Sequence, residues 1–298
     1  MRLLSVGSLN IDRFYDVAAF VRPGETRRVD RVRTSSGGKG LNQSISSARA
    51  GLEVLHVGRV GRDGEFLLDE LRGAGVDTSR VRVGDEESGS TAIQVDPTGQ
   101  NCILVYGGAN QRLERGDILS ALDDLKAGDV VLLQNETNLV PETIRWSAER
   151  GLRVAFNASP LDSDAGGLPL ELLSWLFVNE VEGEQLTGES DTERMVDALT
   201  HRLPGVEVVL TLGDQGSVWA CGSNRRFQRA FETAVVDTTA AGDTFTGYFL
   251  RGALSALEGI SPLELASAAS ALAISRRGAS SSIPALDEVL ASPFLDKV

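Results

Sequence analysis

The chain has 298 residues, a hydrophobic fraction of 42% and a formal net charge of −13 at pH 7. This length suffices for one large α/β domain or two smaller ones, and the balance of apolar and charged residues is ordinary for a globular protein. The strong negative charge argues against a groove for nucleic acid. No apolar run is long enough to cross a membrane, so we expect no membrane partner.

Cysteine and histidine are scarce, with two of each in the chain. Cys102 and Cys221 lie far apart and neither belongs to a CxxC pair, which fits a reducing cytosol and excludes a thiolate zinc site or a disulfide framework. His56 lies in an apolar run, where we expect it to pack in the core, so a His-based catalytic triad is poorly supplied. The N-terminal residues run directly into a strand-like segment, which predicts no signal peptide and a cytoplasmic protein.

The first predicted elements alternate buried strands with polar or glycine-rich turns. Residues 3–6 predict a strand, and Asn10 and Asp12 follow at its carboxyl end. Because ligands collect outside the carboxyl ends of strands in open α/β sheets, both are candidate ligand contacts, although Asn and Asp also favour turns for local reasons. Two adjacent glycines and Lys39 then precede a helix over 44–50, at a spacing that is not that of a Walker A loop.

Two segments depart from this pattern. Residues 13–34 alternate, are rich in arginine and contain a Pro-Gly turn, which is typical of a hairpin. Residues 81–106 predict short strands on both sides of a turn at 96–99. We therefore expect these two segments, about 13–34 and 81–106, to form a small sheet inserted into a single domain over 1–298. Between them, a second main strand is predicted at 54–60, followed by a helix that ends near Gly73.

From residue 129 onward, strands and helices alternate regularly. Strands are predicted at 130–134, 153–156, 175–178 and 207–212, and helices at 142–150 and 180–186. This order is the signature of a parallel sheet with helices on both faces. A hairpin at 217–220 and 225–230 and two helices at 244–257 and 262–275 complete the predicted elements.

The stretch Asp237-Thr-Thr-Ala-Ala-Gly-Asp243 joins a β-branched run to the helix predicted at 244–257. Small residues at 240–242 let backbone N–H groups approach a ligand, and the helix directs the positive end of its dipole to the same place. An anion bound there would meet several unpaired donors, and Asp243 stands where a carboxylate could accept a proton. The alternative is that Asp243 only caps the helix.

Six motifs, in their order and separation, resemble those of the ribokinase-like (PfkB) family of carbohydrate kinases, and above all its ribokinase branch. They extend over nearly the whole chain and are Gly7-Ser-Leu-Asn-Ile-Asp12, Gly37-Gly-Lys-Gly-Leu-Asn-Gln43, Gly107-Gly-Ala-Asn110, Asn179-Glu-Val-Glu182, Thr211-Leu-Gly-Asp-Gln-Gly216 and Asp237-Thr-Thr-Ala-Ala-Gly-Asp243. The resemblance implies a central, mostly parallel sheet flanked by helices, with a small β-sheet lid. It also implies transfer of the γ-phosphoryl group of ATP to a primary hydroxyl of a sugar, D-ribose being the favoured acceptor.

The resemblance further implies roles for residues at motif positions. Asp243 corresponds to the catalytic base, and the backbone N–H groups of Ala240, Ala241, Gly242 and Asp243 to an anion hole for the transferred phosphoryl group. The implied sugar contacts are Asn10, Asp12, Gly38, Lys39, Asn42 and Glu136. The implied contacts to ATP and Mg²⁺ are Asn179, Glu182, Thr211, Gly213, Asp214, Gly216, Gly242 and Ser267. For Lys39 and Ser267, a solvated lysine and a helix-surface serine are the alternatives.

The family also implies a monovalent cation, usually K⁺, beside the anion hole, and a dimer formed through the lid. The implied oxygen ligands, several of them backbone carbonyls, come from Asp237, Thr239, Ala273, Arg276, Gly278 and Ser282. Ser280-Ser281 replaces the commoner Gln-Pro pair in this loop, so a hydrated loop without an ion is the alternative. We expect a homodimer with no nucleic-acid or membrane partner.

Three other functions compete with this interpretation. A nucleoside kinase of the same fold usually lacks the lysine of Gly-Gly-Lys-Gly and stacks its base on aromatic residues, which make up only 5% of this chain. A sugar-phosphate kinase needs extra cations, which lid arginines such as Arg27 or Arg31 would supply. A catalytically silent sugar or nucleotide sensor has no need for Asp243 beside an intact anion hole.

Overall fold

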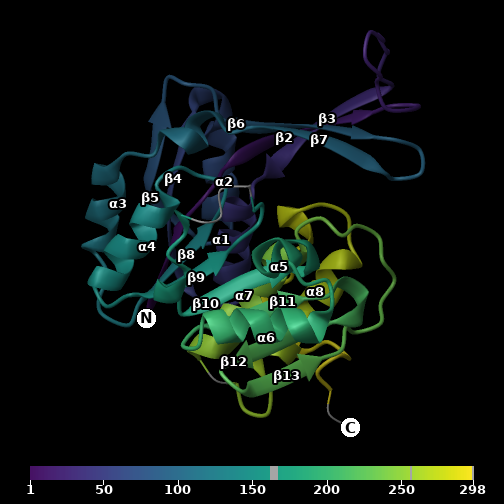
Figure 1. Ribbon diagram of the computed structural model, residues 1–298. Helices are drawn as coiled ribbons and strands as arrows, with labels where there is room; N and C mark the ends of the chain where they lie inside the picture. The colour runs from purple at the N-terminus through teal and green to yellow at the C-terminus, as the bar shows by residue number, and fades with distance from the viewer. Residues whose placement is uncertain (162–166, 256, 297–298) are drawn as a thin grey trace.

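The computed structural model describes residues 1–161, 167–255 and 257–296. Its elements form a nine-stranded sheet with helices on both faces and a separate four-stranded sheet (Figure 1). The α/β class expected from the sequence is therefore confirmed. No helix within the described ranges combines the length and the apolar character needed to cross a bilayer.

The large sheet is parallel except at one edge. Neighbours from β11 to β5 pair parallel, whereas β12 pairs antiparallel with both β11 and β13. In spatial order its strands are β13 (Asn224–Gln228), β12 (Ser217–Cys221), β11 (Glu207–Thr211), β10 (Trp175–Asn179), β9 (Arg153–Asn157), β8 (Val130–Gln134), β1 (Arg2–Val6), β4 (Glu53–Gly61) and β5 (Asp77–Gly84).

The central strands divide their side chains between two hydrophobic cores, because successive residues of a strand point to opposite faces. On β8, Val130 and Leu132 belong to one core, Val131 and Leu133 to the other, and all four are fully buried. With helices on both faces, such a strand is apolar throughout, as is usual in parallel sheets. His56 on β4 is also fully buried, in agreement with its expected packing role.

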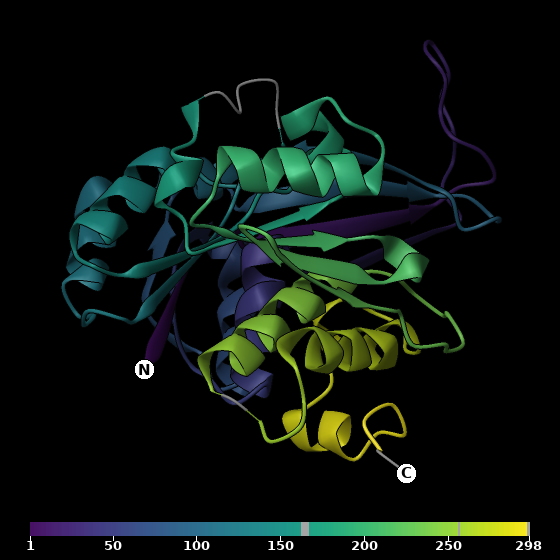
Figure 2. The same cartoon turned by 60° about the horizontal axis from the view of Figure 1, so that its bottom comes forward.

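Helices cover both faces of the large sheet. Figure 2 shows the green helix α6 on one side and the yellow-green and yellow C-terminal helices on the other. The first core receives side chains from α1 (Lys39–Arg49), α2 (Glu65–Gly73), α7 (Ala241–Leu254), α8 (Pro262–Ile274) and α9 (Leu286–Leu290). The second receives them from α3 (Arg115–Leu122), α4 (Val140–Glu149) and α6 (Thr192–Arg202), with Leu186 of α5 (Glu180–Thr187) packed beside it. Of these, α3, α6 and α9 add to the elements predicted from the sequence.

Strand β1 lies between β8 and β4, so the chain extends the sheet first on one side of β1 and later on the other. Such a reversal opens a crevice at the carboxyl ends of the strands, where open α/β sheets bind ligands. The turns that follow β1, β8, β10 and β11 all end at this edge of the sheet, as the sequence analysis expected for the first strand.

The four-stranded sheet contains β3 (Arg31–Gly37), β2 (Asn10–Asp16), β6 (Gly89–Val95) and β7 (Asn101–Tyr106), in that order, and we call it the lid sheet. It extends beyond the helices at the top of Figure 1. The sequence analysis placed residues 81–84 in this sheet, but they are the end of β5 and pair with β4 in the large sheet. The error has a physical cause: β5 is a half-exposed edge strand whose alternating polar residues resemble those of the lid strands.

Helix α7 begins earlier than predicted, at Ala241, and ends at Leu254; the predicted end at Leu257 runs through residue 256, which lies outside the described residues. Its N-terminal capping position is Ala240, and no side chain caps it. Asp243 therefore lies within the first turn of the helix, and the alternative of a capping aspartate is wrong.

Helices α1 and α7 pack so closely that their backbones approach each other. The Ser46 hydroxyl on α1 donates a hydrogen bond of 2.9 Å to the carbonyl of Thr244 on α7. A Cβ atom added at Gly247 would overlap the Ser46 hydroxyl and lie 2.7 Å from the backbone nitrogen of Ser47. The glycine thus sets the distance between the two helices that carry Lys39 and Asp243.

We expect Gly247→Ala to destabilise the protein, because the added methyl group must push α1 and α7 apart. The overpacking should lower the free energy of unfolding by about 1–3 kcal/mol, even after the better helix propensity of alanine is counted. The control is Gly116→Ala on α3, where an added Cβ meets no atom within 4 Å. That variant should be as stable as the wild type or slightly more stable in urea unfolding, and equal losses in both variants would contradict the packing argument.

Candidate active site

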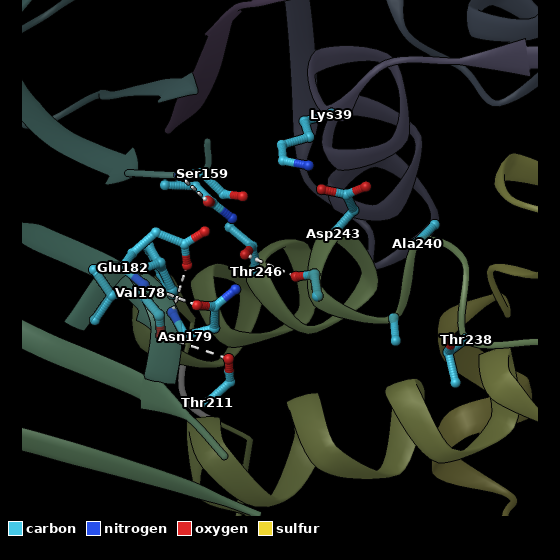
Figure 3. Close-up of a pocket in the computed structure, with 14 residues that line it drawn as sticks. Lys39, Ser159, Val178, Asn179, Glu182, Thr211, Thr238, Ala240, Asp243 and Thr246 are labelled. Carbon is cyan, nitrogen blue, oxygen red and sulfur yellow. Dashed lines mark hydrogen bonds between the residues drawn. The ribbon is translucent and has the colours of Figure 1, made fainter. Parts of the chain in front are cut away.

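A cavity of about 210 Å³ lies at the carboxyl edge of the large sheet (Figure 3). In Figure 3, Lys39 and Asp243 approach it from one side, and Asn179, Glu182 and Thr211 from the other. The sequence motifs therefore meet here from distant parts of the chain. Those of the sequence-derived site residues that line the cavity are Lys39, Asn179, Glu182, Thr211, Ala240, Ala241, Gly242 and Asp243.

The turn before α7 presents backbone donors to this cavity. Ala240 adopts a left-handed conformation with φ of 61°, a conformation that alanine rarely takes and that costs free energy. In the described part of the chain, no acceptor pairs with the N–H groups of Gly242 and Asp243, whereas the N–H of Ala241 donates to the Thr238 carbonyl at 3.2 Å. A Cβ atom added at Gly242 would meet no atom within 4 Å, so this glycine faces open space. The turn therefore offers an anion fewer free backbone N–H groups than the sequence predicted, because the N–H of Ala241 already has an acceptor.

Asp243 is buried at the junction of α7 and α1. Its two carboxylate oxygens accept hydrogen bonds from the side-chain amides of Asn42, at 3.0 Å, and Gln43, at 2.9 Å. Only 9% of its surface is exposed. Consecutive residues of one helix thus hold the carboxylate in a single orientation.

The pKa values of Asp243 and Lys39 are coupled by their charges. Burial raises the pKa of Asp243 above its ordinary value, although Lys39, Gln43 and Asn42 all favour the ionised form. Burial also lowers the pKa of Lys39, but the charges of Asp243, Glu136 and Glu182 more than compensate, so that its pKa lies above the ordinary value. Lys39 is therefore a charged, half-buried cation that faces the cavity beside the Glu136 carboxylate.

Glu136 connects the start of α1 to the turn after β8. Its carboxylate accepts hydrogen bonds from the Ser8 hydroxyl and from the backbone N–H of Lys39, the latter at 3.1 Å. The ammonium group of Lys39 lies 3.6 Å from the same carboxylate. Gly38, which precedes Lys39, has φ of 95° and lets the chain turn tightly into the helix. The structure thus brings Glu136, Gly38 and Lys39 together, as the sequence predicted.

Asn10 and Asp12 begin the lid sheet next to this group. The Thr91 hydroxyl donates to the Asp12 carboxylate at 2.7 Å, and the Asn110 amide donates to the side-chain carbonyl of Asn10 at the same distance. Burial raises the pKa of Asp12 from its ordinary value of 3.8 to about 6, with a further contribution from the charge of Glu136 and opposing ones from Thr91 and Lys39. Both residues are nearly buried, in positions that turn chemistry alone does not require.

Asn179 and Glu182 form a reciprocal capping box at the start of α5. The Asn179 side chain accepts from the backbone N–H groups of Val181 and Glu182, and one carboxylate oxygen of Glu182 accepts from that of Asn179 at 2.9 Å. Glu182 is nearly buried, and both residues line the cavity. A single carboxylate at this wall suits a hard cation that keeps much of its hydration shell, such as Mg²⁺.

The remaining residues assigned to the nucleotide lie further from the cavity. Thr211, at the end of β11, lines it, but Gly213, Asp214 and Gly216 form the turn into β12 and are not among its walls. Ser267 is buried on α8, so the alternative of a helix-surface serine is wrong, yet it does not line the cavity either.

Asp237 ties together two loops beside the turn before α7. Its carboxylate accepts from the backbone and side chain of Thr239 and from the backbone N–H of Gly278, at 2.6–3.0 Å. Burial opposes ionisation, but these hydrogen bonds and the charge of Arg277 outweigh it, so the pKa of Asp237 lies below its ordinary value.

The backbone N–H of Asp237 also donates to the Ile274 carbonyl. This brings the segments of Asp237, Thr239, Ala273, Arg276 and Gly278 close together, while the guanidinium group of Arg276 pairs with Glu288 and leaves only its carbonyl for an ion.

Several residues that sequence reasoning missed complete the cavity. Asn157 ends β9 and Ser159 lies two residues further on; both line the wall near Asn179, and Thr246 lines it one helical turn after Gly242. The signal for Asn157 and Ser159 was available, since they directly follow a predicted strand at the same sheet edge as Asn10 and Asp12. Thr246 gives no comparable signal because its hydroxyl bonds to the Gly242 carbonyl, as any helical threonine can.

A helix N-terminus with free donors, a charged lysine and a buried carboxylate in one cavity are the features that phosphoryl transfer requires. Comparison with known proteins agrees with this class. Residues 1–286 match the family described as pfkB family carbohydrate kinase. The chain belongs to this family, and the resemblance drawn from its motifs is confirmed.

Individual relatives cover nearly the whole chain. The chain is 33% identical to ribokinase of Staphylococcus aureus over 97% of its own length and 98% of that protein. It superposes on the structure of Arabidopsis thaliana ribokinase complexed with ribose and ATP with a TM-score of 0.87 and 31% identity, covering 100% of this chain and 99% of that one. For ribokinase of Cryptococcus neoformans in complex with ADP, the TM-score is 0.85 at 31% identity, over 97% and 98% of the two chains.

The raised pKa of Asp12 predicts a pH-dependent effect of Asp12→Asn on stability. In the unfolded chain the Asp12 carboxyl ionises near pH 4, whereas in the folded chain it stays protonated until the pH rises through about 6. Ionising the buried carboxyl lowers the free energy of unfolding, and this loss is largest above pH 6, where the carboxyl is ionised in both states. Relative to the wild type, Asp12→Asn should therefore gain about 1–2 kcal/mol in free energy of unfolding between pH 5 and pH 8.

The measurement is urea unfolding of both proteins at the two pH values. Gly116→Ala changes no titrating group, so its difference from the wild type should be the same at both. A constant difference for Asp12→Asn would show that burial does not perturb Asp12.

Proposed function

We propose that the protein is an ATP-dependent kinase that transfers the γ-phosphoryl group to the primary hydroxyl of a sugar, D-ribose above all, to form ribose 5-phosphate. The observation that carries the proposal is the buried Asp243 carboxylate, held by two amides directly beside the open turn before α7. The whole-length similarity to ribokinases, one of them in complex with ribose and ATP, supports the choice of substrates.

Asp243 is the proposed general base. Burial raises its pKa toward the range in which a carboxylate accepts a proton effectively, while Lys39 and the two amides favour its ionised form. As the sugar hydroxyl attacks the γ-phosphorus, its proton passes to a carboxylate oxygen of Asp243, and the bond from the γ-phosphorus to the β–γ bridging oxygen breaks to release ADP. The amides of Asn42 and Gln43 hold that carboxylate without themselves exchanging protons.

The turn before α7 is the proposed anion hole. The free N–H groups of Gly242 and Asp243 and the positive end of the helix dipole stabilise the charge that develops on the transferred phosphoryl group. Lys39, fixed by Glu136, adds a positive charge on the opposite side of Asp243. The proposed nucleotide contacts further out are Asn179, Thr211, Gly213, Asp214, Gly216 and Ser267.

Two cations complete the proposal. Glu182 would hold Mg²⁺, largely through water, and the ion would neutralise charge on the ATP phosphates. The loops joined by Asp237 would hold K⁺ through oxygens of Thr239, Ala273, Arg276, Gly278 and Ser282, next to the turn before α7. The ionised state of Asp237 and its bonds to both loops support this position.

The sugar is proposed to lie between Asp243 and the start of the lid sheet, against Asn10, Asp12, Gly38, Asn42 and Glu136. Amide and carboxylate side chains suit neighbouring hydroxyl groups because an amide can both donate and accept, and a carboxylate can accept from two hydroxyls. Closure of the lid sheet would exclude water and so suppress hydrolysis of ATP.

The lid sheet is also the proposed dimer interface, and the cytoplasm, where ATP is supplied, the proposed location. Four consecutive side chains of the edge strand β7, Ile103 to Tyr106, are between 49% and 70% exposed. An apolar edge strand of this kind is a ready surface for a second copy of the chain.

We expect Asp243→Asn to fold normally and to lose about 10³-fold or more in kcat, because an amide cannot accept the proton. The Asn42 amide can rotate to accept from the new NH₂ group, since its own oxygen has no partner within the described ranges. Turnover is measured by coupled ADP release, and folding by circular dichroism, with Gly116→Ala as a control that keeps wild-type turnover. Near-normal turnover of Asp243→Asn would contradict the assignment of the base.

The same assay identifies the acceptor when it is run with D-ribose, 2-deoxyribose, hexoses, sugar phosphates and nucleosides. We expect the highest kcat/KM for D-ribose. A preference for nucleosides or sugar phosphates would replace the proposed substrate, and no ADP release with any acceptor would favour a sensor.

The cation proposal predicts faster turnover in K⁺ or NH₄⁺ than in Na⁺ at constant ionic strength. Asp237→Asn should reduce this difference, since it removes the charge that holds the ion while keeping a hydrogen-bond acceptor for Gly278. Equal rates in all three salts for the wild type would show that the loop binds no activating ion.

A further inference from the structure

Gln43, the last residue of the Gly37–Gln43 motif, forms side-chain hydrogen bonds on both sides. Its side-chain nitrogen donates to Asp243 at 2.9 Å, and its side-chain oxygen accepts from the amide of Gln134 at 2.8 Å. Gln43 and Gln134 are both fully buried. A continuous row of hydrogen bonds therefore runs from the end of β8, through α1, to α7.

The direction of this row is fixed by its last member. An ionised carboxylate can only accept, so the nitrogen of Gln43 must face Asp243 and its oxygen must face away. Gln134 must then present its own nitrogen to that oxygen. Its remaining oxygen is left buried, with no donor among the residues that the structure describes.

The unpaired oxygen of Gln134 costs stability, which indicates that this glutamine serves a purpose other than stability. A buried acceptor without a partner is unfavourable, and an apolar residue in place of Gln134 would avoid that penalty. Gln134, however, adds a second constraint to the one that Asp243 imposes. If the Gln43 amide rotated, its oxygen would face the Asp243 carboxylate and its NH₂ group would face the NH₂ group of Gln134, so both hydrogen bonds would be lost.

Two glycines leave the room that the row needs. A Cβ atom added at Gly7 would overlap the side-chain oxygen of Gln134 and lie 2.6 Å from the Cα atom of Gly40, and one added at Gly40 would overlap the backbone nitrogen of Ser8. The end of β1 and the first turn of α1 thus approach within backbone contact, with the Gln134 side chain beside them. Two glycines of the sequence motifs are explained by this close approach.

Asn42 differs from Gln43 because no further residue orients its amide. Asn42 also donates to Asp243, at 3.0 Å, but within the described ranges nothing bonds to its oxygen. The orientation of its amide is therefore set by Asp243 alone, and its oxygen is free to accept from a substrate hydroxyl. Of the two amides that hold Asp243, only that of Gln43 is oriented by a further residue.

We propose that Gln43 and Gln134 are positioning residues for the base: Gln134 orients the Gln43 amide, and Gln43 holds the Asp243 carboxylate in the orientation that faces the substrate hydroxyl. The inference rests on the proposed function, because it gives Asp243 the role of base. Neither glutamine touches the reacting atoms, and both act through Asp243.

The test compares Gln43→Met, Gln134→Met and the double variant with the wild type in the ADP-release assay. Methionine keeps the volume but forms no hydrogen bond of this kind. Gln43→Met should lower kcat about 10- to 100-fold, as expected for a misplaced catalytic group, and Gln134→Met about 3- to 10-fold, with KM for sugar and ATP within about twofold. Because Gln134 acts only through Gln43, the double variant should be no slower than Gln43→Met.

The matched control is Ser46→Ala, which removes another hydrogen bond between α1 and α7 without touching Asp243. It should keep kcat within about twofold of the wild type. An equal loss in Ser46→Ala, multiplicative losses in the double variant, or a change in KM alone would each overturn the proposal, since they indicate general loosening or substrate binding.

A further variant keeps the test decisive if Gln43→Met does not fold. Gln134→Leu has a similar volume and offers no donor, so it should lower kcat about as much as Gln134→Met. Wild-type kcat in Gln134→Leu would overturn the proposal. If the wild type is active and Asp243→Asn is not, unchanged glutamine variants contradict this inference alone, whereas an inactive wild type overturns both, because there is then no base to position.

Discussion

The structure depends on the placement of one ionisable carboxylate, Asp243, in a nearly dry position between two helices. A buried negative charge is costly unless hydrogen bonds and an opposite charge compensate for it. Here the compensation comes from the amides of Asn42 and Gln43 and from Lys39, all on α1. This explains why α1 must approach α7 within backbone contact, and hence why Gly247 lies at their crossing. The cost of burial is what shifts the pKa of the carboxylate toward a value useful for a base.

Several unfavourable local features lie around this carboxylate. Ala240 is held in a left-handed conformation, Gln134 buries an unpaired oxygen, and Asp12 has a pKa raised to about 6. Each costs stability, and each lies within the group of residues that would bind substrate or orient the base. The continuous apolar side chains of the central strands, divided between the two cores, provide the stability that offsets these costs.

Most of the large sheet follows from the sequence, because its strands are continuous apolar runs separated by helices, and the signal for such strands is strong. The positions of Asn10 and Asp12 follow from the rule that ligands bind at the carboxyl ends of strands. That of the turn before α7 follows from its small residues at the start of a helix. The assignment of 81–84 to the lid was wrong because an edge strand and a lid strand share the same alternation. The roles of Gln43 and Gln134 could not be predicted, since their partners lie 200 and 91 residues away and hydrogen-bond direction is a property of the folded chain. Asp243 is a similar case: a helix cap and a buried base have the same local sequence.

A crystal structure of the protein with D-ribose and a non-hydrolysable ATP analogue would test the central claim most directly. The account predicts that the primary hydroxyl oxygen of the sugar lies about 2.6–3.2 Å from a carboxylate oxygen of Asp243, with the terminal phosphate of the analogue facing the N–H groups of Gly242 and Asp243. A complex in which both ligands are bound with the lid sheet closed, but the hydroxyl faces another side chain and Asp243 contacts neither ligand, would contradict it.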